Sequence, residues 1–506
     1  MTDFLSLHAV LWPVGVPIVA AALTACLWSL PRAQRLVSIT ATILMFAASV
    51  LLLAVVETSG VQVARFGSWA APFGIVFAAD RFGAAMVCAA SLVALSVIIF
   101  GLADIRRREA RAGFHPLFQG MLAGINGAFL TGDLFNLYVW FEIMLITAMG
   151  LLVIGRTRAQ LDGTLKYASL NLLSTILFLL AVGILYGVAG TLNMADLALV
   201  IRETEPSATL TIASVLLLCG FGIKAGFFPL FFWLPASYHT GSITVQAIFA
   251  GLLTKVGVYA CVRVFTLILP VSQNGIGTIL AVLAAGTMIF GVLGALAHLD
   301  LRRILAYQII SQLGFMVMGL AIATPLAIAS AIFYVLQDIV VKANLFLLAG
   351  ATARAGGTYD LAKAGGLAAR SPFLAFLFVL PALSLAGMPP LSGFVGKILV
   401  VDAALAGGAA WLAVIALAVG FLNLFSMCRI WLAMFWKTST LPRASARSVP
   451  VAMLGPIAVL GAATLAMGLY AEPLVAFANA AARDLLDPSA YITAVLGDAV
   501  NLREGR

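Results

Sequence analysis

The stretch LFNLYVWFEIMLITAMGLLVIG, residues 134–155, places a single carboxylate, Glu142, inside a run of apolar residues. A run of about 20 such residues is long enough to cross the hydrocarbon layer of a bilayer as a helix. No basic side chain lies at helical spacing from Glu142, because Tyr138 precedes it and Ile146 follows. An acid at this depth is costly unless it is paired or hydrated. We therefore expect its compensating charge on another helix.

Composition extends this interpretation to the whole chain. Of the 506 residues 63% are hydrophobic and only 10% are charged, against roughly 25% charged in soluble domains. Apolar runs of spanning length recur about fourteen times, and strands of period two are not apparent in the sequence. We expect an all-α polytopic membrane protein, with 1–506 as a single membrane domain. The net charge of +9 is typical of basic residues at helix ends, so we expect no nucleic-acid partner.

Basic residues in the loops predict the orientation of the chain. The expected spans are 4–30, 34–56, 77–101, 113–131, 133–155, 166–190, 208–232, 241–269, 275–298, 302–323, 325–351, 371–405, 409–436 and 449–479. Most Lys and Arg fall in odd-numbered loops, as in Arg106, Arg107 and Arg108. Because basic loops stay in the cytoplasm, we expect odd-numbered loops there and both termini on the external side.

Two expected spans contain helix breakers at depth. The span 208–232 and its continuation carry Pro229 and Pro235, and 371–405 carries Pro389 and Pro390. Broken helices at matching places in two halves are typical of transporters built from inverted repeats. We therefore predict two inverted five-helix repeats. The expected units are 1–112 with three N-terminal helices, 113–270 and 271–437 with the repeats, and 438–506 with a C-terminal helix and tail.

Four lysines lie far from any loop: Lys224, Lys255, Lys342 and Lys397. Only Lys342 has an acid in its own helix, Asp338, four residues earlier, in the order that favours an ion pair. Lys342 and Asp338 therefore fit either a self-contained structural pair or a place in a chain of proton carriers. The other lysines need partners from neighbouring helices or from water.

Lysine and glutamate suit proton transfer in a way that arginine does not. Both can be tuned by burial and by neighbouring charges to exchange protons near neutral pH, whereas arginine stays protonated. We predict a relay of Glu142, Lys224, Lys255 and Lys397, in which a lysine such as Lys224 neutralises Glu142. His239, at the cytoplasmic end of the first broken helix, fits either proton supply or a polar interfacial role.

Motifs for enzymatic chemistry are not apparent. The sequence lacks GxSxG, HExxH and any Cys/His cluster, and its five cysteines are scattered in apolar runs. The stretches GFGIKAG (220–226) and GFVGK (393–397) resemble phosphate-binding loops only in part, because neither has the required spacing and context. We therefore expect a transporter subunit with no cofactor and no metal site, and not an enzyme.

Four stretches resemble one family closely. They are TGDLFNLYVWFEIML (131–145), KAGFFPLFFWLPASYHTGSITVQAIFAGLLTKVGVYA (224–260), RRILAYQIISQLGFMVMGL (302–320) and GMPPLSGFVGK (387–397). These stretches are similar to the antiporter-like subunits shared by Mrp-type Na⁺/H⁺ antiporters and respiratory complex I, most of all to the D-type subunit of Mrp. The resemblance implies fourteen helices, two inverted repeats, and a bacterial-type inner (plasma) membrane location beside other subunits of a hetero-oligomeric complex.

The resemblance also implies residue roles. Glu142 matches the family's helix-five glutamate, Lys224 its helix-seven lysine, Lys255 its central lysine, and Lys397 its terminal helix-twelve residue. A lysine at the terminal position differs from the glutamate expected in the M-type subunit of complex I. The L-type and Mrp A subunits are expected to carry long C-terminal extensions, which this sequence does not show.

One position departs from the family pattern. Gln337 stands where many members have a histidine in helix eleven, and glutamine cannot titrate. A path there would then need water, or Asp338 and Lys342.

Three functional hypotheses follow. The first is a proton-conducting subunit of an antiporter that exchanges protons for a monovalent cation such as Na⁺. The second is the same module in a redox-driven pump, of the complex I or membrane-bound hydrogenase type. The third is a non-conducting scaffold that anchors partner subunits. The cation is not identifiable, because no carboxylate-rich cage suited to a hard ion is apparent.

Overall fold

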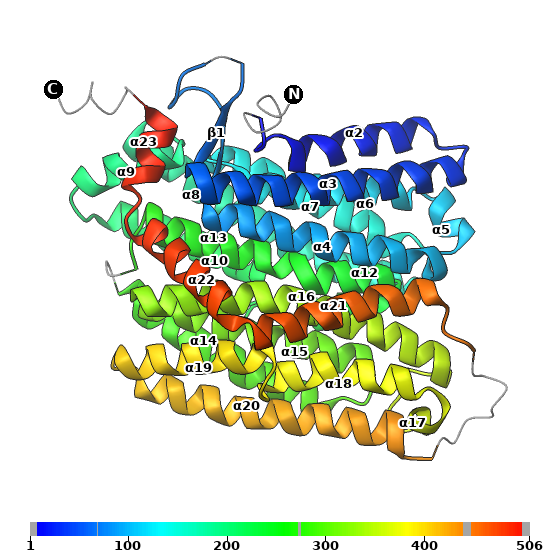
Figure 1. The fold of residues 1–506 in the computed structure, drawn as a ribbon. Coiled ribbons are helices and arrows are strands. Elements are labelled where there is room, and N and C mark those ends of the chain that lie inside the picture. The colour runs from blue at the N-terminus through cyan, green and yellow to red at the C-terminus, as the bar shows by residue number, and fades with distance from the viewer. Residues whose placement is uncertain (1–7, 68, 272–274, 439–446, 498–506) are drawn as a thin grey trace.

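The computed structural model describes residues 8–67, 69–271, 275–438 and 447–497, and most of them form long helices that run side by side (Figure 1). The helices are α2 (Trp12–Cys26), α3 (Pro31–Ser59), α4 (Arg81–Asp104), α5 (Arg107–Arg111), α6 (Phe114–Leu130), α7 (Leu134–Val153), α8 (Arg158–Ala189), α9 (Met194–Glu203), α10 (Ala208–Ala225), α11 (Trp233–Ser237), η1 (Tyr238–Thr240), α12 (Ile243–Ile248), η2 (Phe249–Leu253), α13 (Thr254–Leu267), α14 (Ile276–Ala297), α15 (Leu301–Ile322), α16 (Pro325–Gly356), α17 (Leu367–Arg370), α18 (Pro372–Ala386), α19 (Ser392–Ala406), α20 (Ala410–Trp431), η3 (Leu432–Trp436), α21 (Val451–Leu469), α22 (Ala471–Leu486) and α23 (Ser489–Leu496).

The expected class is confirmed. Among the described residues, 11 helices are long and apolar enough to cross a membrane, and α2 and α18 are shorter apolar helices. The count of fourteen spans stays a prediction, and so do the two repeats and the boundaries of the four units. The break in the expected span 371–405 leaves two helices, α18 and α19, of 15 residues each, which is shorter than a membrane-crossing helix. The expected start of the first span, residues 4–7, lies outside the described residues.

Several element boundaries differ from expectation. The helix α8 begins at Arg158, not at 166, because the Thr157 side chain caps it together with Gln160. The expected span 449–479 consists of two helices, α21 and α22, which meet at Tyr470. The amphipathic helix α9 was not expected. Its 10 residues, which include Asp196, Arg202 and Glu203, are too few and too polar to be recognised as a span.

Two short strands were not expected either. The strands β1 (Gln62–Arg65) and β2 (Val76–Ala79) pair antiparallel, with Gln62 opposite Ala79. They connect α3 to α4, and Phe77 of β2 forms a further bridge with Thr131. At four residues each they are too short for a period-two pattern to stand out in an apolar sequence.

The centre of the molecule is formed by two helical segments. The span Ile243–Leu267 is 100% buried in its most apolar window and α16 is 94% buried, whereas α3 and α8 are 33% buried. The helix α16 packs against α4, α12, α15, α18, α19, α21 and α22. Charged residues on α13 and α16 therefore face protein rather than lipid.

Both broken helices have the same kind of break. The helix α10 ends at Ala225 before α11 begins at Trp233, and α18 ends at Ala386 before α19 begins at Ser392. A left-handed glycine follows each helix, Gly226 at φ +84° and Gly387 at φ +85°, a conformation that favours glycine. The predicted breakers Pro229, Pro389 and Pro390 lie in the gaps, whereas Pro235 lies within α11.

The loops separate into two sets at opposite ends of the helices. In Figure 1, α5 and α17 lie at one end, and β1, α9 and α23 lie at the other. The Arg-rich α5, with Arg107, Arg108 and Arg111, therefore lies opposite the β-hairpin. This arrangement agrees with the alternation of basic loops along the sequence.

Candidate functional site

Glu142 and Lys224 meet through a hydroxyl group on a third helix. Thr175 of α8 donates a hydrogen bond from Oγ1 to Glu142 Oε1 at 2.6 Å, and Lys224 Nζ of α10 donates to the same Oγ1 at 3.4 Å. Thr175 Oγ1 also lies 3.1 Å from the carbonyl oxygen of Asn171. Lys224 Nζ lies 5.3 Å from the centre of the Phe141 ring. The carboxylate and the ammonium are thus joined by one hydroxyl group.

Glu142 lies at the border between the interior and the outer face of α7. Its side chain is half-buried, and its helix neighbours Val139 and Ile146 are 37% and 60% exposed. Its carboxylate is nevertheless bonded inward, to Thr175 on α8. The contact with Thr175 therefore turns the charge away from the exposed apolar face.

Lys255 forms an ion pair at the centre of the molecule. Its Nζ lies 2.9 Å from Asp338 Oδ2, and both side chains are almost completely buried, at 0% and 1% exposed. Lys255 Nζ also donates to the carbonyl oxygen of Ala250 at 2.7 Å. Ala250 belongs to η2, a π-helical turn, and such turns are frequent at functional sites. A buried pair of this kind depends on both partners, because either charge alone would be uncompensated.

Lys342 does not form the self-contained pair with Asp338 that remained open from the sequence. Its Nζ donates to the carbonyl oxygen of Gln308 on α15 at 2.9 Å, and Asp338 is the ion-pair partner of Lys255. Asp338 and Lys342 are four residues apart on one helix, a spacing that suits an ion pair, but Lys255 of α13 lies closer to Asp338. Spacing along α16 could not show this contact. Asp338 and Lys342 thus bring three helices, α13, α15 and α16, to one buried polar centre.

Lys397 lies against the second break. Its Nζ donates to the carbonyl oxygens of Leu385 and Ala386, both at 2.9 Å. These carbonyls end α18, where the partial negative charge of a helix favours a cation. Lys397 Nζ also lies 5.3 Å from the centre of the Phe315 ring. The half-buried lysine lines a groove of about 420 Å³ with Asp402, an exposed acid on α19.

The structure brings the predicted relay residues together in groups. The helices of Lys224 and Lys255 are in close contact, because a Cβ atom on Gly257 would lie 2.7 Å from the backbone nitrogen of Ala225. Within the described ranges, no hydrogen bond or ion pair joins Lys224 to Lys255 directly. A proton passing between the two lysines, as the sequence predicts, would need mobile carriers or side-chain movement.

His239 of η1 lies in a polar pocket between η1 and the start of α15. Its Nδ1 lies 2.9 Å from the Pro235 carbonyl oxygen, so Nδ1 carries the proton, and Nε2 lies 3.3 Å from an Arg303 nitrogen. The pocket, of about 470 Å³, also includes Asp300 and Arg302. Burial and the neighbouring guanidinium of Arg303 lower the pKa of His239 below its usual 6.5.

Gln337 lies apart from the polar centre and faces the second break. Its Oε1 accepts a hydrogen bond from Ser392 Oγ at 3.5 Å, and Ser392 Oγ lies 3.0 Å from Ser384 Oγ. The glutamine is buried, at 3% exposed. Its side chain therefore contacts the broken helix, whereas Asp338 and Lys342 bond to α13 and α15.

Sequence reasoning missed two features. Thr175 was overlooked because a threonine in an apolar helix normally bonds its own backbone. A second buried ion pair joins Arg263 of α13 to Asp80, with nitrogen to oxygen distances of 2.6 and 2.7 Å. Arg263 lies within an expected span and could have been recognised as a deep charge. Asp80 caps α4 by accepting from Gly83, and Tyr491 of α23 covers the guanidinium, so this pair fixes the opposite end of α13.

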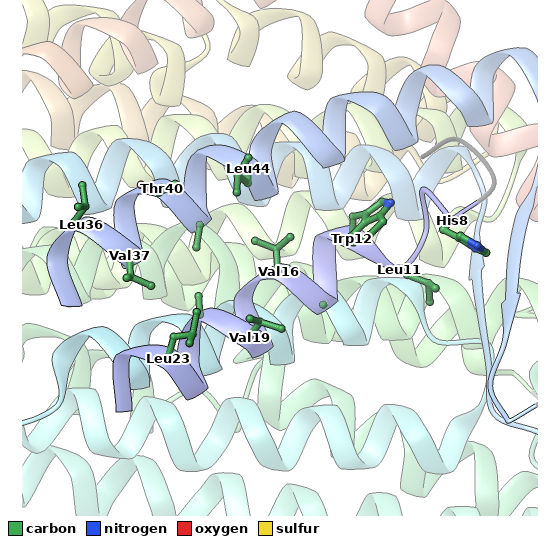
Figure 2. Close-up of a pocket in the computed structure, with 13 residues that line it drawn as sticks. His8, Leu11, Trp12, Val16, Val19, Leu23, Leu36, Val37, Thr40 and Leu44 are labelled. Atoms are coloured by element: carbon green, nitrogen blue, oxygen red, sulfur yellow. The ribbon is translucent and has the colours of Figure 1, made fainter. Parts of the chain in front are cut away.

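A second groove lies away from this site. It has a volume of about 870 Å³, lies between α2 and α3, and is lined by residues such as Trp12, Val16 and Leu44 (Figure 2). Among the described residues that line it, His8 is the titratable one. In the part of the chain that the structure describes, no group of three or more His, Cys, Asp or Glu residues could hold a metal ion.

Comparisons with known proteins place this chain among membrane transport subunits. The model of the family described as "NADH:quinone oxidoreductase/Mrp antiporter, TM" matches residues 131–423. The D-type subunit of the Na⁺/H⁺ antiporter of Alkalihalophilus pseudofirmus is 45% identical over 97% of this chain and 99% of its own length.

Solved structures agree. A chain of the Mrp complex from Dietzia sp. DQ12-45-1b is similar with a TM-score of 0.90 and 32% identity, covering 97% of this chain and 100% of that one. A chain of respiratory complex I from Thermus thermophilus is similar with a TM-score of 0.79 and 26% identity, covering 95% of this chain and 99% of that one.

Proposed function

Because the chain belongs to the family of antiporter-like membrane subunits shared by NADH:quinone oxidoreductases and Mrp antiporters, we propose that it is the proton-translocating subunit of a multi-subunit Na⁺/H⁺ antiporter. It is a multi-pass membrane protein of the transporter class. The observation that carries the proposal is the bridge from Glu142 through Thr175 to Lys224 within membrane-spanning helices.

The proposed relay begins at Glu142 and Lys224 and passes along the close contact of α10 and α13 to Lys255. The Lys255–Asp338 pair then couples to Lys342, and the last carrier is Lys397 at the second break. Each step joins groups that can bind and release a proton. A charge that leaves one group changes the energy of the next, because the low-dielectric interior strengthens their interaction.

We propose the two inverted repeats, 113–270 and 271–437, as the frame of this relay. The matching glycine caps at Gly226 and Gly387 support it. The basic loops support an orientation with α5 and α17 in the cytoplasm and both termini outside. In that orientation the pocket of His239 opens to the cytoplasm and can supply protons.

The test is exchange driven by a pH gradient in membrane vesicles that contain the whole complex. We expect Glu142→Gln and Lys224→Met to abolish exchange while the complex still assembles. The control is Glu203→Gln, which changes an exposed acid at the end of α9 and should leave exchange intact. Exchange retained by the Glu142→Gln complex would refute the relay.

A redox-driven pump is a second candidate, favoured by the similarity to the complex I chain. The two candidates differ in the proteins that accompany the chain. Purification of the native complex decides between them: subunits with iron–sulfur ligands would favour the pump, and their absence from a complex that exchanges Na⁺ for H⁺ favours the antiporter. A passive scaffold is distinguished by tolerance of Lys224→Met and Lys255→Met in the exchange measurement.

A further inference from the structure

Three neighbouring side chains of α15 carry buried polar atoms without partners among the described residues. Both amide atoms of Gln308, the hydroxyl of Ser311 and the amide nitrogen of Gln312 are buried and have no hydrogen-bond partner within the described part of the chain. All three side chains are at most 1% exposed. Buried polar atoms in proteins are nearly always bonded to protein or to ordered water. Three neighbouring residues of this kind on one helix therefore mark a place where water binds.

Gln308 and Gln312 lie on the side of α15 that contacts α16, and Ser311 lies beside them where α15 meets Gly291 of α14. Residues 308, 311, 312 and 315 are three or four positions apart along α15 or adjacent to one another, so their side chains share one face of the helix. At one end of the row, Lys342 Nζ bonds the backbone oxygen of Gln308. At the other end, the Phe315 ring lies under Lys397 Nζ. The row thus runs from Lys342 towards Lys397, the two relay residues between which the structure shows no direct bond.

Tyr334 fixes the orientation of one member of the row. Its hydroxyl donates to Gln312 Oε1 at 2.5 Å, and its ring stacks on Phe315 with centres 5.3 Å apart. Since the oxygen of Gln312 is engaged, its unbonded Nε2 is the atom left to bind water. The Nε2 group can donate a hydrogen bond to a water oxygen, so Gln312 can hold a water molecule in a set direction without taking up the proton itself.

We propose that Gln308, Ser311 and Gln312 position a chain of water molecules that carries protons between the Lys342–Asp338 centre and Lys397. Each water oxygen accepts one proton from its neighbour and releases another to the next, so no net change remains on the chain. This inference rests on the proposed relay, and it names the residues that connect its second half. It also assigns the path to α15, so Gln337 of α16, which faces the second break, is not required.

The test compares two buried glutamines in the whole complex. Gln312→Met removes the amide at similar volume, and Gln337→Met does the same one helix away. We expect Gln312→Met to lower the initial rate of pH-driven exchange by at least about tenfold, and Gln337→Met to leave it within about twofold. Gln312→Glu keeps the length and the polar atoms, and should restore part of the rate that Gln312→Met loses.

Two smaller substitutions, both of serine to alanine, control for misfolding. Ser311→Ala removes one unpartnered hydroxyl and should slow exchange by about threefold. Ser330→Ala removes a hydroxyl that already bonds its own helix, at Ala327, and should not. Equal loss in Gln312→Met and Gln337→Met, no loss in Gln312→Met, or equal effects in the two serine variants would each overturn the proposal. Glu142→Gln is measured in parallel: if it abolishes exchange while Gln312→Met does not, the relay stands and this inference fails.

Discussion

At the residue scale, each deep charge depends on a polar group that a different helix supplies. Glu142, Lys224, Lys255 and Lys397 stand out because a charge within an apolar run is rare. Their contacts come from other helices: Thr175 from α8 and Asp338 from α16. Spacing along one helix cannot reveal such contacts, and for Asp338 it suggested Lys342, which bonds Gln308 instead.

Thr175→Val tests the hydroxyl bridge. Valine has nearly the same shape but lacks the hydroxyl, so the bonds to Glu142 and Lys224 are both lost. We expect the initial rate of pH-driven exchange to fall by about tenfold or more, with normal assembly. Thr175→Ser keeps the hydroxyl and serves as the control. Equal rates in the two variants would show that the hydroxyl has no role in transfer.

Asp338→Asn tests the central ion pair. The change leaves the fully buried Lys255 without its counter-charge, and breaking a buried pair costs about 3–5 kcal/mol. We expect a lower unfolding temperature of the purified complex, and recovery of most of the loss in the double variant Asp338→Asn, Lys255→Met. An Asp338→Asn complex as stable as the unmodified one would contradict the pairing.

At the element scale, prolines predicted where the helices break. The structure adds which side chains bond the backbone carbonyls near each break. Lys397 bonds the carbonyls that end α18, whereas at the first break Trp233 bonds the carbonyl of Ile223. The hairpin of β1 and β2 and the short helix α9 were missed. Their stability comes from contacts with other elements, which outweigh the weak local signal of short segments.

Gly387→Ala tests the second break. A Cβ atom there would lie 2.6 Å from Lys397 Cδ, in a backbone with φ +85°. Gly408 has a similar φ of +73° and nothing within 4 Å, so Gly408→Ala controls for backbone strain of about 1–2 kcal/mol. We expect both variants to lower the unfolding temperature, but only Gly387→Ala to slow exchange. Similar exchange rates in the two would show that the position of Lys397 is unimportant.

His239 predicts how acid affects stability. Its pKa is lowered by burial and by Arg303, so below its ordinary value of about 6.5 the unfolded chain binds a proton more readily than the folded one. Its contribution is therefore intact above pH 6.5 and is lost as the pH falls through the folded pKa. We expect His239→Gln to make the unfolding temperature less sensitive to pH below about 6.5. Parallel curves for both proteins, followed by calorimetry or fluorescence, would contradict this.

At the scale of the whole molecule, composition alone established the membrane class, and the family resemblance gave the likeness to known complexes. Neither could show which faces are covered by other subunits. Large apolar side chains remain exposed on α7 and α8, among them Phe135, Ile146 and Ile176. These faces can contact lipid or a partner subunit. Exposed apolar side chains suit either neighbour, so the sequence pattern does not distinguish them.

Orientation is testable at this scale. The background is a variant of this chain in which the native cysteines are replaced. In intact cells that carry it, Glu203→Cys at the end of α9 should react with a membrane-impermeant maleimide added outside. Arg108→Cys in α5 should react only after the membrane is opened, because the two elements lie at opposite ends of the helices (Figure 1). The reverse pattern would place the termini in the cytoplasm.

In the proposed relay, the single hydroxyl of Thr175 would set the order in which protons pass. It has one hydrogen and two acceptors within reach, Glu142 at 2.6 Å and the Asn171 carbonyl at 3.1 Å. When Lys224 passes a proton through this oxygen to Glu142, the new O–H bond points back towards the lysine, and the group must rotate before it can serve again. The carbonyl of Asn171 offers a resting orientation on the way. In this relay the threonine would therefore pass protons one at a time.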